Sequence, residues 1–196
     1  MTIQIAILGA ESTGKSDLIE AMLLLFAARK IETVCAVPEV LRQFCVDHGR
    51  APLAREQRGI LDQQMAVEQS VIEQSVIEQS ASERVQNQHH HHVIVLSDCA
   101  PITTAIYSEM YFNDRSLMSI ATAHHKRYRL SLVLMPDLGW HADPLPFMRD
   151  GPNAQMDFHR RLVEWLDLAQ MSHQLIAGSG QSRTQCALDA IIKHTR

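Results

Sequence analysis

Near the start of the chain lie Gly9-Ala10-Glu11-Ser12-Thr13-Gly14-Lys15-Ser16, directly after an apolar run and at the head of a segment of helical composition. They fit the pattern G-x-x-x-x-G-K-[ST] at every defined position. The two glycines permit backbone angles that let the loop turn its N–H groups toward an anion. Lys15 adds a cation for the β- and γ-phosphates, and the Ser16 hydroxyl suits Mg²⁺. We therefore predict a phosphate-binding loop for a nucleoside triphosphate, ATP with Mg²⁺.

The rest of the chain alternates between short β-like runs and longer helical segments, which favours an α/β fold with a parallel sheet. The strands are expected at Ile3–Leu8, Glu32–Val37, Val93–Ser97, Leu130–Met135 and Gln174–Ala177. The helices are expected at residues 15–28, 38–48, 53–85, 102–112, 117–128, 155–171 and 182–193. The loop between the first strand and the first helix then predicts a three-layer phosphate-loop fold with strand order 2-3-1-4-5.

Composition limits the class of protein. The 196 residues fit one domain (1–196), and 18 basic against 22 acidic residues give a net charge of −4, without the basic excess of a nucleic-acid binder. The four cysteines are scattered, which favours reduced thiols and a cytoplasmic location. The first residues do not resemble a signal peptide, and the longest apolar stretch, Ala21–Ala28, is too short for a membrane span. We expect a soluble protein with neither a nucleic-acid nor a membrane partner.

Residues 68–92 have low complexity and are interpreted as an insertion. Glu-Gln-Ser-Val-Ile repeats with a five-residue period across Glu68–Ser80, so its Val-Ile pairs advance about 140° around a helix at each repeat. This drift favours a solvated helix lengthened by duplication, with a homo-oligomer contact through helix 53–85 as the alternative. The run His89–His92 is interpreted as a solvated loop rather than a metal site.

Two acidic residues follow predicted strands and favour a small-molecule kinase over other nucleotide-binding classes. The N-K-x-D sequence of guanine-specific switches is absent, and Asp98 is followed by Cys99 rather than by the glutamate of an ATPase motor. A kinase needs an acid for Mg²⁺ and a carboxylate near the acceptor hydroxyl. Asp98 and Glu39 fit these tasks, and either is a candidate base. We expect phosphoryl transfer from ATP to a small nucleoside-like acceptor; the alternative is an ATP-binding sensor, or an ATPase without such an acceptor.

Residues 136–152 have the composition of a lid that would exclude water from the γ-phosphate. The segment contains four prolines, two glycines, Trp140 and Arg149. An arginine suits the delocalised charge of a transferring phosphoryl group, so Arg149 is a catalytic candidate beside Lys15.

The order of several motifs resembles that of phosphate-loop kinases such as the ribosylnicotinamide kinase domain of NadR. The motifs are Gly9–Ser16, Pro38–Phe44, Asp98–Thr104, Trp140…Asp143…Arg149 and Ile176–Arg183. They cover most of the chain outside the repeat and the histidine run. An adenylyltransferase half is not expected, and Ser97 stands where the family often has a second acid.

The resemblance implies roles for individual residues. Glu39 and Arg42 would lie near the acceptor, and Asp98 at Mg²⁺ or at the acceptor hydroxyl. Gly178 and Arg183 would border the adenine. Trp140 would stack on a flat acceptor ring, with nicotinamide riboside the favoured acceptor.

Overall fold

The computed structural model describes residues 2–29, 33–86, 92–142 and 151–195. Its centre is a parallel five-stranded sheet in the order β2-β3-β1-β4-β5, which confirms the expected fold class and strand order. The strands are β1 (Thr2–Leu8), β2 (Thr33–Val37), β3 (Val93–Asp98), β4 (Leu130–Leu134) and β5 (His173–Ile176). The first, third and fourth strands are apolar almost throughout because both faces of the sheet are covered by helices.

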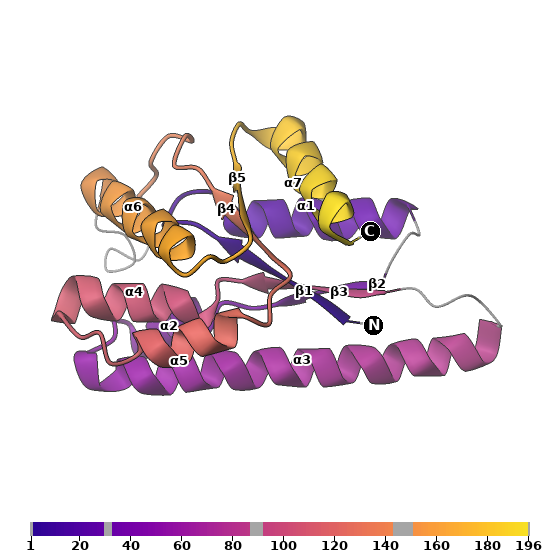
Figure 1. Ribbon diagram of the computed structural model, residues 1–196, viewed down its shortest axis with the longest axis horizontal. Helices are drawn as coiled ribbons and strands as arrows, with labels where there is room; N and C mark the ends of the chain where they lie inside the picture. Colours follow the sequence, from indigo (N-terminus) through magenta and orange to yellow (C-terminus); the bar gives the residue numbers. More distant parts are fainter. Residues whose placement is uncertain (1, 30–32, 87–91, 143–150, 196) are drawn as a thin grey trace.

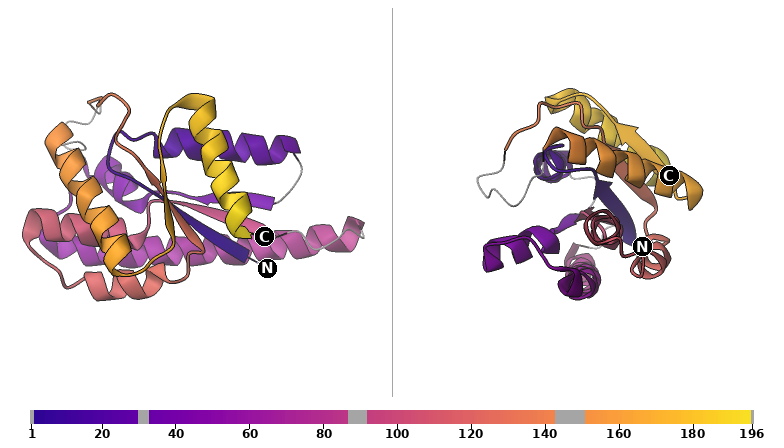
Figure 2. Two further views of the ribbon diagram at one scale, coloured as in Figure 1. Left: turned by 45° about the horizontal axis from the view of Figure 1, so that its top comes forward. Right: turned by 90° about the vertical axis from the view of Figure 1, so that its left-hand side faces the viewer.

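Helices pack on both faces of the sheet (Figures 1 and 2). They are α1 (Lys15–Arg29), α2 (Val40–His48), α3 (Gln57–Gln86), α4 (Pro101–Phe112), α5 (Met118–His125), α6 (Pro152–Leu168) and α7 (Gly180–Thr195), with a short 3-10 turn at Ala54–Glu56. Alternate residues of β1 serve the two cores: Ile5 and Ile7 pack with α1 and α7, and Ala6 and Leu8 pack with α3, α4 and α6.

The Val-Ile pair of the first Glu-Gln-Ser-Val-Ile repeat packs against the core, whereas the pair of the second repeat is exposed. Val71 and Ile72 pack against valines of β2 and β3. One repeat further along α3, Val76 and Ile77 are 42% and 69% exposed. The helix extends past the sheet at this end (Figure 1). The drift of the repeat around the helix axis explains the difference, because only the first pair faces the sheet.

The strand order places the candidate site at the carboxyl edge of the sheet. β1 lies between β3 and β4, and the helices that follow β1 and β4 lie on opposite faces. Such a point leaves a crevice outside the strand ends, where open α/β sheets bind ligands. No helix in the described part of the chain is long and apolar enough to cross a membrane.

Candidate functional site

The phosphate loop is held by its own side chains. Thr13 Oγ1 donates a 2.8 Å hydrogen bond to the Ala10 carbonyl, and Lys15 Nζ donates to the Gly9 and Ala10 carbonyls, each at 3.1 Å. These bonds fold the lysine over the loop. The loop therefore presents a fixed turn with one cation above it, at the N-terminus of α1, as a phosphate site requires.

Both loop glycines are needed for close packing or for the backbone angle. A Cβ on Gly9 would lie 2.7 Å from Thr13 Oγ1 and 3.2 Å from the Leu134 carbonyl oxygen. Gly14 has φ of +75°, a region that side chains rarely adopt. The structure thus gives a physical reason for the two glycines of the motif.

Arg183 lies behind the phosphate loop. Its guanidinium donates to the Thr13 carbonyl at 2.5 Å and to the Met135 carbonyl at 3.0 Å, and it forms an ion pair with Asp137. The backbone N–H of Gly178 donates to the same aspartate at 2.6 Å. The buried Arg183 therefore ties the loop to the ends of β4 and β5, and neither it nor Gly178 lines the cavity described below. Sequence reasoning missed Asp137, although it follows a predicted strand.

Ser16 and Asp98 meet at the predicted magnesium position. Ser16 Oγ donates a 2.9 Å hydrogen bond to Asp98 Oδ2, and Asp98 Oδ1 is buried with no hydrogen-bond partner in the described part of the chain. Ligand atoms of Glu39, Asp98 and Cys99 lie within 4.8 Å of one another. Mg²⁺ prefers hard oxygen ligands, so the hydroxyl and the carboxylates fit it and the Cys99 thiol does not.

Burial and charge set the protonation of the site. Burial raises the pKa of Glu39, an effect that Lys15 partly offsets. Burial would lower the pKa of Lys15, but the acidic groups around it outweigh burial and raise it. Burial, with the nearby Glu39, raises the pKa of Cys99 well above its usual range, so this thiol stays protonated. The site therefore holds a charged Lys15 beside Glu39, and burial favours the protonated, neutral form of the Glu39 carboxyl group.

A cavity of about 910 Å³ opens from the phosphate loop into a second compartment. This second compartment is lined by Glu39 and Arg42 and by the aromatic residues Tyr107, Tyr111 and Phe112. The two tyrosine rings stack with centroids 5.8 Å apart. Sequence reasoning missed these aromatics on α4, although their i, i+4 spacing is visible in the sequence.

Two residues that line the same cavity each have a buried, unpaired polar atom. Among the described residues, Gln57 Oε1 and Thr103 Oγ1 have no hydrogen-bond partner, and both residues are 3% exposed. Buried polar groups are nearly always paired, so unpaired atoms beside a cavity are candidates for a hydrogen bond to a bound ligand or water. Gln57 carries no signal in the sequence, whereas Thr103 lies in the motif after Asp98.

The described part of the expected lid contacts the phosphate loop. Leu138, Gly139 and His141 line the cavity, and the His141 backbone N–H donates to Ser12 Oγ at 2.9 Å. Trp140 is half-buried and does not line the cavity, and its indole N–H has no partner among the described residues. Arg149, like Asp143, lies outside the described residues.

Helix α6, which follows the expected lid, contacts both the phosphate loop and α4. Gln155 Nε2 donates to the Glu11 carbonyl at 2.7 Å.

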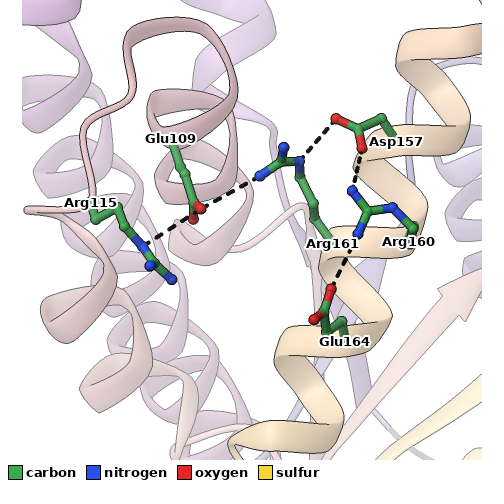
Figure 3. Close-up of polar contacts among 6 residues, drawn as sticks. All are labelled: Glu109, Arg115, Asp157, Arg160, Arg161 and Glu164. Atoms are coloured by element: carbon green, nitrogen blue, oxygen red, sulfur yellow. Dashed lines mark hydrogen bonds and ion pairs between the residues drawn. The ribbon is translucent and has the colours of Figure 1, made fainter.

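Ion pairs join α6 to α4. Arg161 contacts Asp157 at 2.9 Å on its own helix and Glu109 of α4 at 3.5 Å (Figure 3). The same figure shows Arg160 between Asp157 and Glu164, and Arg115 on the far side of Glu109. These contacts hold α6 against α4, the helix whose residues Tyr107, Tyr111 and Phe112 form an aromatic wall of the cavity.

A family model described as an AAA domain matches residues 4–183, most of the chain. The chain belongs to the AAA domain family. A comparison with curated proteins gave no match.

Solved structures place this AAA domain among phosphate-loop folds. Two NadR structures, one in complex with NR and one with NAD and AMP-PNP, have TM-scores of 0.69 and 0.66 at 18% identity. Each comparison covers 99% of this chain but only 52% and 49% of the NadR chains, so this chain spans about half their length. Deoxyadenosine kinase from M. mycoides with bound dATP has a TM-score of 0.56 at 7% identity, covering 97% of this chain and 99% of that one. These likenesses concern the fold.

Proposed function

We propose that this AAA domain is an ATP-dependent kinase that transfers the γ-phosphoryl group to a small nucleoside-like acceptor. One observation carries the proposal: a single cavity joins the phosphate loop to a compartment lined by a carboxyl group, an arginine and three aromatic side chains. A nucleotide-hydrolysing motor or switch has no need of such a compartment. A flat, polar acceptor would fill it, because aromatic walls hold a ring and charged groups fix its substituents.

Each residue of the site has its own role in the proposed phosphoryl transfer. The backbone from Gly9 to Ser16 would hold the phosphates, and Lys15 and Arg149 would stabilise charge on the transferred group. Mg²⁺, held by Ser16 and Asp98, would supply charge neutralisation at the phosphates. Glu39 or Asp98 would accept the hydroxyl proton of the acceptor. Burial raises the pKa of Glu39, which favours this role because a base works best with a pKa near the operating pH.

Nicotinamide riboside is the proposed acceptor. Support comes from the NadR neighbour whose structure contains NR, together with the motif order of the sequence. Arg42 lines the compartment and would contact the acceptor, and Trp140 would reach its ring if the lid closes further. Gly178 remains a candidate for the adenine border.

The setting of the protein is part of the proposal. All four cysteines are free thiols, which fits the cytoplasm. The exposed Val76 and Ile77 of α3 remain candidates for a homo-oligomer contact.

The test is ADP release from Mg·ATP with a panel of nucleosides that includes nicotinamide riboside. We expect release that depends on one acceptor, that is lost in Lys15→Ala and that is kept in Lys126→Ala, an exposed lysine at the end of α5. ATP binding without stimulation by any acceptor would reject the kinase in favour of a nucleotide sensor.

A further inference from the structure

Glu39 stands at the N-cap of α2 but does not cap the helix. Its backbone has φ of −75° and ψ of 107°, and its side chain makes no capping hydrogen bond. An N-cap side chain normally accepts a bond from an N–H of the first helical turn. The Glu39 carboxyl group lies instead at the cavity wall, so the start of α2 needs an acceptor from elsewhere.

Gln64 of α3 provides that acceptor. The Val40 N–H donates to Gln64 Oε1 at 2.9 Å, and Gln64 Nε2 is 3.3 Å from the Pro38 carbonyl oxygen. The glutamine is 3% exposed and lies 24 residues away from Val40 in the chain. One side-chain amide thus binds the backbone on both sides of Glu39.

A buried carboxyl group sets the orientation of that amide. Gln64 Nε2 lies 3.5 Å from Glu68 Oε1, which accepts hydrogen bonds, so the oxygen of the amide must face Val40. Glu68 is itself 1% exposed and held by two partners: Tyr128 donates to Oε1 at 2.6 Å, and His124 Nε2 is 2.7 Å from Oε2. Glu68, held by His124 of α5 and by Tyr128 just after that helix, therefore fixes the glutamine before any ligand binds.

We propose that Gln64 is a positioning residue, which caps α2 from α3 and thereby leaves the Glu39 carboxyl group facing the acceptor compartment. Without this amide, the Glu39 side chain, at the N-cap position, is the group placed to accept from the first N–H groups of α2. The carboxyl group then turns toward the helix and away from the cavity. The structural part stands by itself, and the consequence for catalysis rests on the proposed kinase function.

Amide hydrogen exchange at Val40 tests the structural part without any catalysis. In Gln64→Met, which keeps the length of the side chain but removes the amide, we expect exchange at Val40 to accelerate at least about tenfold. Gln63→Met, the exposed neighbour on α3, should leave that rate unchanged. Equal protection of Val40 in a folded Gln64→Met protein would overturn the proposal.

Steady-state kinetics with Mg·ATP and nicotinamide riboside test the catalytic part. Gln64→Met should lower kcat about tenfold or more, because a misplaced catalytic group loses rate steeply, while KM for Mg·ATP stays within about twofold. An equal loss of ATP affinity would indicate general loosening and contradict a positioning role. Absence of phosphoryl transfer by the wild-type protein would reject the proposed kinase function. The exchange rates at Val40 would still test whether Gln64 caps α2.

Gln64→Glu is the variant to use if Gln64→Met does not fold. One oxygen still faces the Val40 N–H, and one proton shared with Glu68 replaces the hydrogen bond from the amide to that carboxyl group, while the contact with the Pro38 carbonyl is lost. Val40 should therefore stay protected. Rapid exchange at Val40 in this variant would overturn the proposal.

Discussion

The Ser16 hydroxyl donates a 2.9 Å hydrogen bond to Asp98, 82 residues further along the chain. The contact follows from the sheet register, because Ile7 at the end of β1 pairs with Asp98 at the end of β3. The phosphate loop starts just after β1, so its last residue returns to the carboxyl end of the neighbouring strand. Two oxygens from distant segments are thereby brought together at the predicted magnesium position.

Asp98→Asn should raise the Mg²⁺ concentration needed for half-maximal activity and lower kcat about 100-fold, because one charged oxygen ligand is lost. The amide preserves the shape and can still bind Ser16, so the thermal midpoint should change little. Activity titrated with MgCl₂ measures the effect. Asp189→Asn, on the exposed face of α7, is the control. An unchanged Mg²⁺ requirement would remove Asp98 from the metal site.

Arg183→Met should destabilise the nucleotide-free protein by about 2 kcal/mol or more, because buried acceptors lose their donor. Those acceptors are the Thr13 and Met135 carbonyls, and Asp137 loses its ion pair as well. Urea unfolding measures the free energy.

Arg160→Met provides the matched comparison for Arg183→Met. Arg160 is 61% exposed and contacts only exposed or half-exposed acids of its own helix, so its loss should cost little (Figure 3). If Arg183→Met lowered ATP affinity without changing the stability of the nucleotide-free protein, the result would support the predicted adenine-bordering role.

Sequence reasoning recovered the sheet because each buried strand is a short apolar run and each crossover is a long helical segment. It recovered the loop because the motif specifies backbone geometry locally. The positions of Asp98 and Glu39 followed from the rule that parallel strands end at one edge. All of these inferences depend on neighbours in the chain or on one topological rule.

Contacts between distant side chains were not predictable in the same way. Arg183 follows the last strand and resembles a nucleotide contact in sequence, but the structure shows it buried against the Thr13 carbonyl, 170 residues away. Gln57 and Gln64 read as ordinary polar residues of a solvated helix. Only the packing of α3 against α2 and α4 shows that these two glutamines are buried. The aromatic residues of α4 could likewise not be assigned to a site from the sequence, because only the structure shows that they line the cavity.

Thr103→Val should weaken acceptor binding without weakening the fold. The Thr103 hydroxyl is buried and unpaired, so an isosteric apolar side chain should leave the free energy of unfolding unchanged or raise it by up to about 1 kcal/mol. KM for the acceptor should rise about tenfold, because a ligand group loses its partner. Parallel kinetics and urea unfolding measure both effects.

The control for Thr103→Val is Thr122→Val, because the Thr122 hydroxyl already donates to the Met118 carbonyl at 2.6 Å, on α5. It should not change the acceptor KM. A clear loss of stability in Thr103→Val would show that the hydroxyl has a structural partner and is not held for a ligand.

Glu39→Gln should stabilise the protein at neutral pH while removing activity. Burial raises the pKa of Glu39 in the folded protein, so the unfolded chain ionises first and the folded state is penalised as pH rises. The free-energy difference between variant and wild type should be near zero below about pH 4, grow as pH rises from there to the folded pKa, and level off above it. Urea unfolding between pH 4 and pH 8, roughly the range over which glutamates ionise, measures it.

Glu56→Gln is the matched control for Glu39→Gln and should have the opposite sign. The Arg50 guanidinium and the Leu53 N–H lower the pKa of Glu56 to about 2. Ionised Glu56 therefore favours the folded state, so its replacement should destabilise at neutral pH, and the difference should vanish as pH falls through that folded pKa. If both variants changed stability in the same direction at pH 7, burial would not be what penalises the Glu39 charge. The pKa of Glu39 would then not be raised in the folded protein, and that argument for Glu39 as the base would fall.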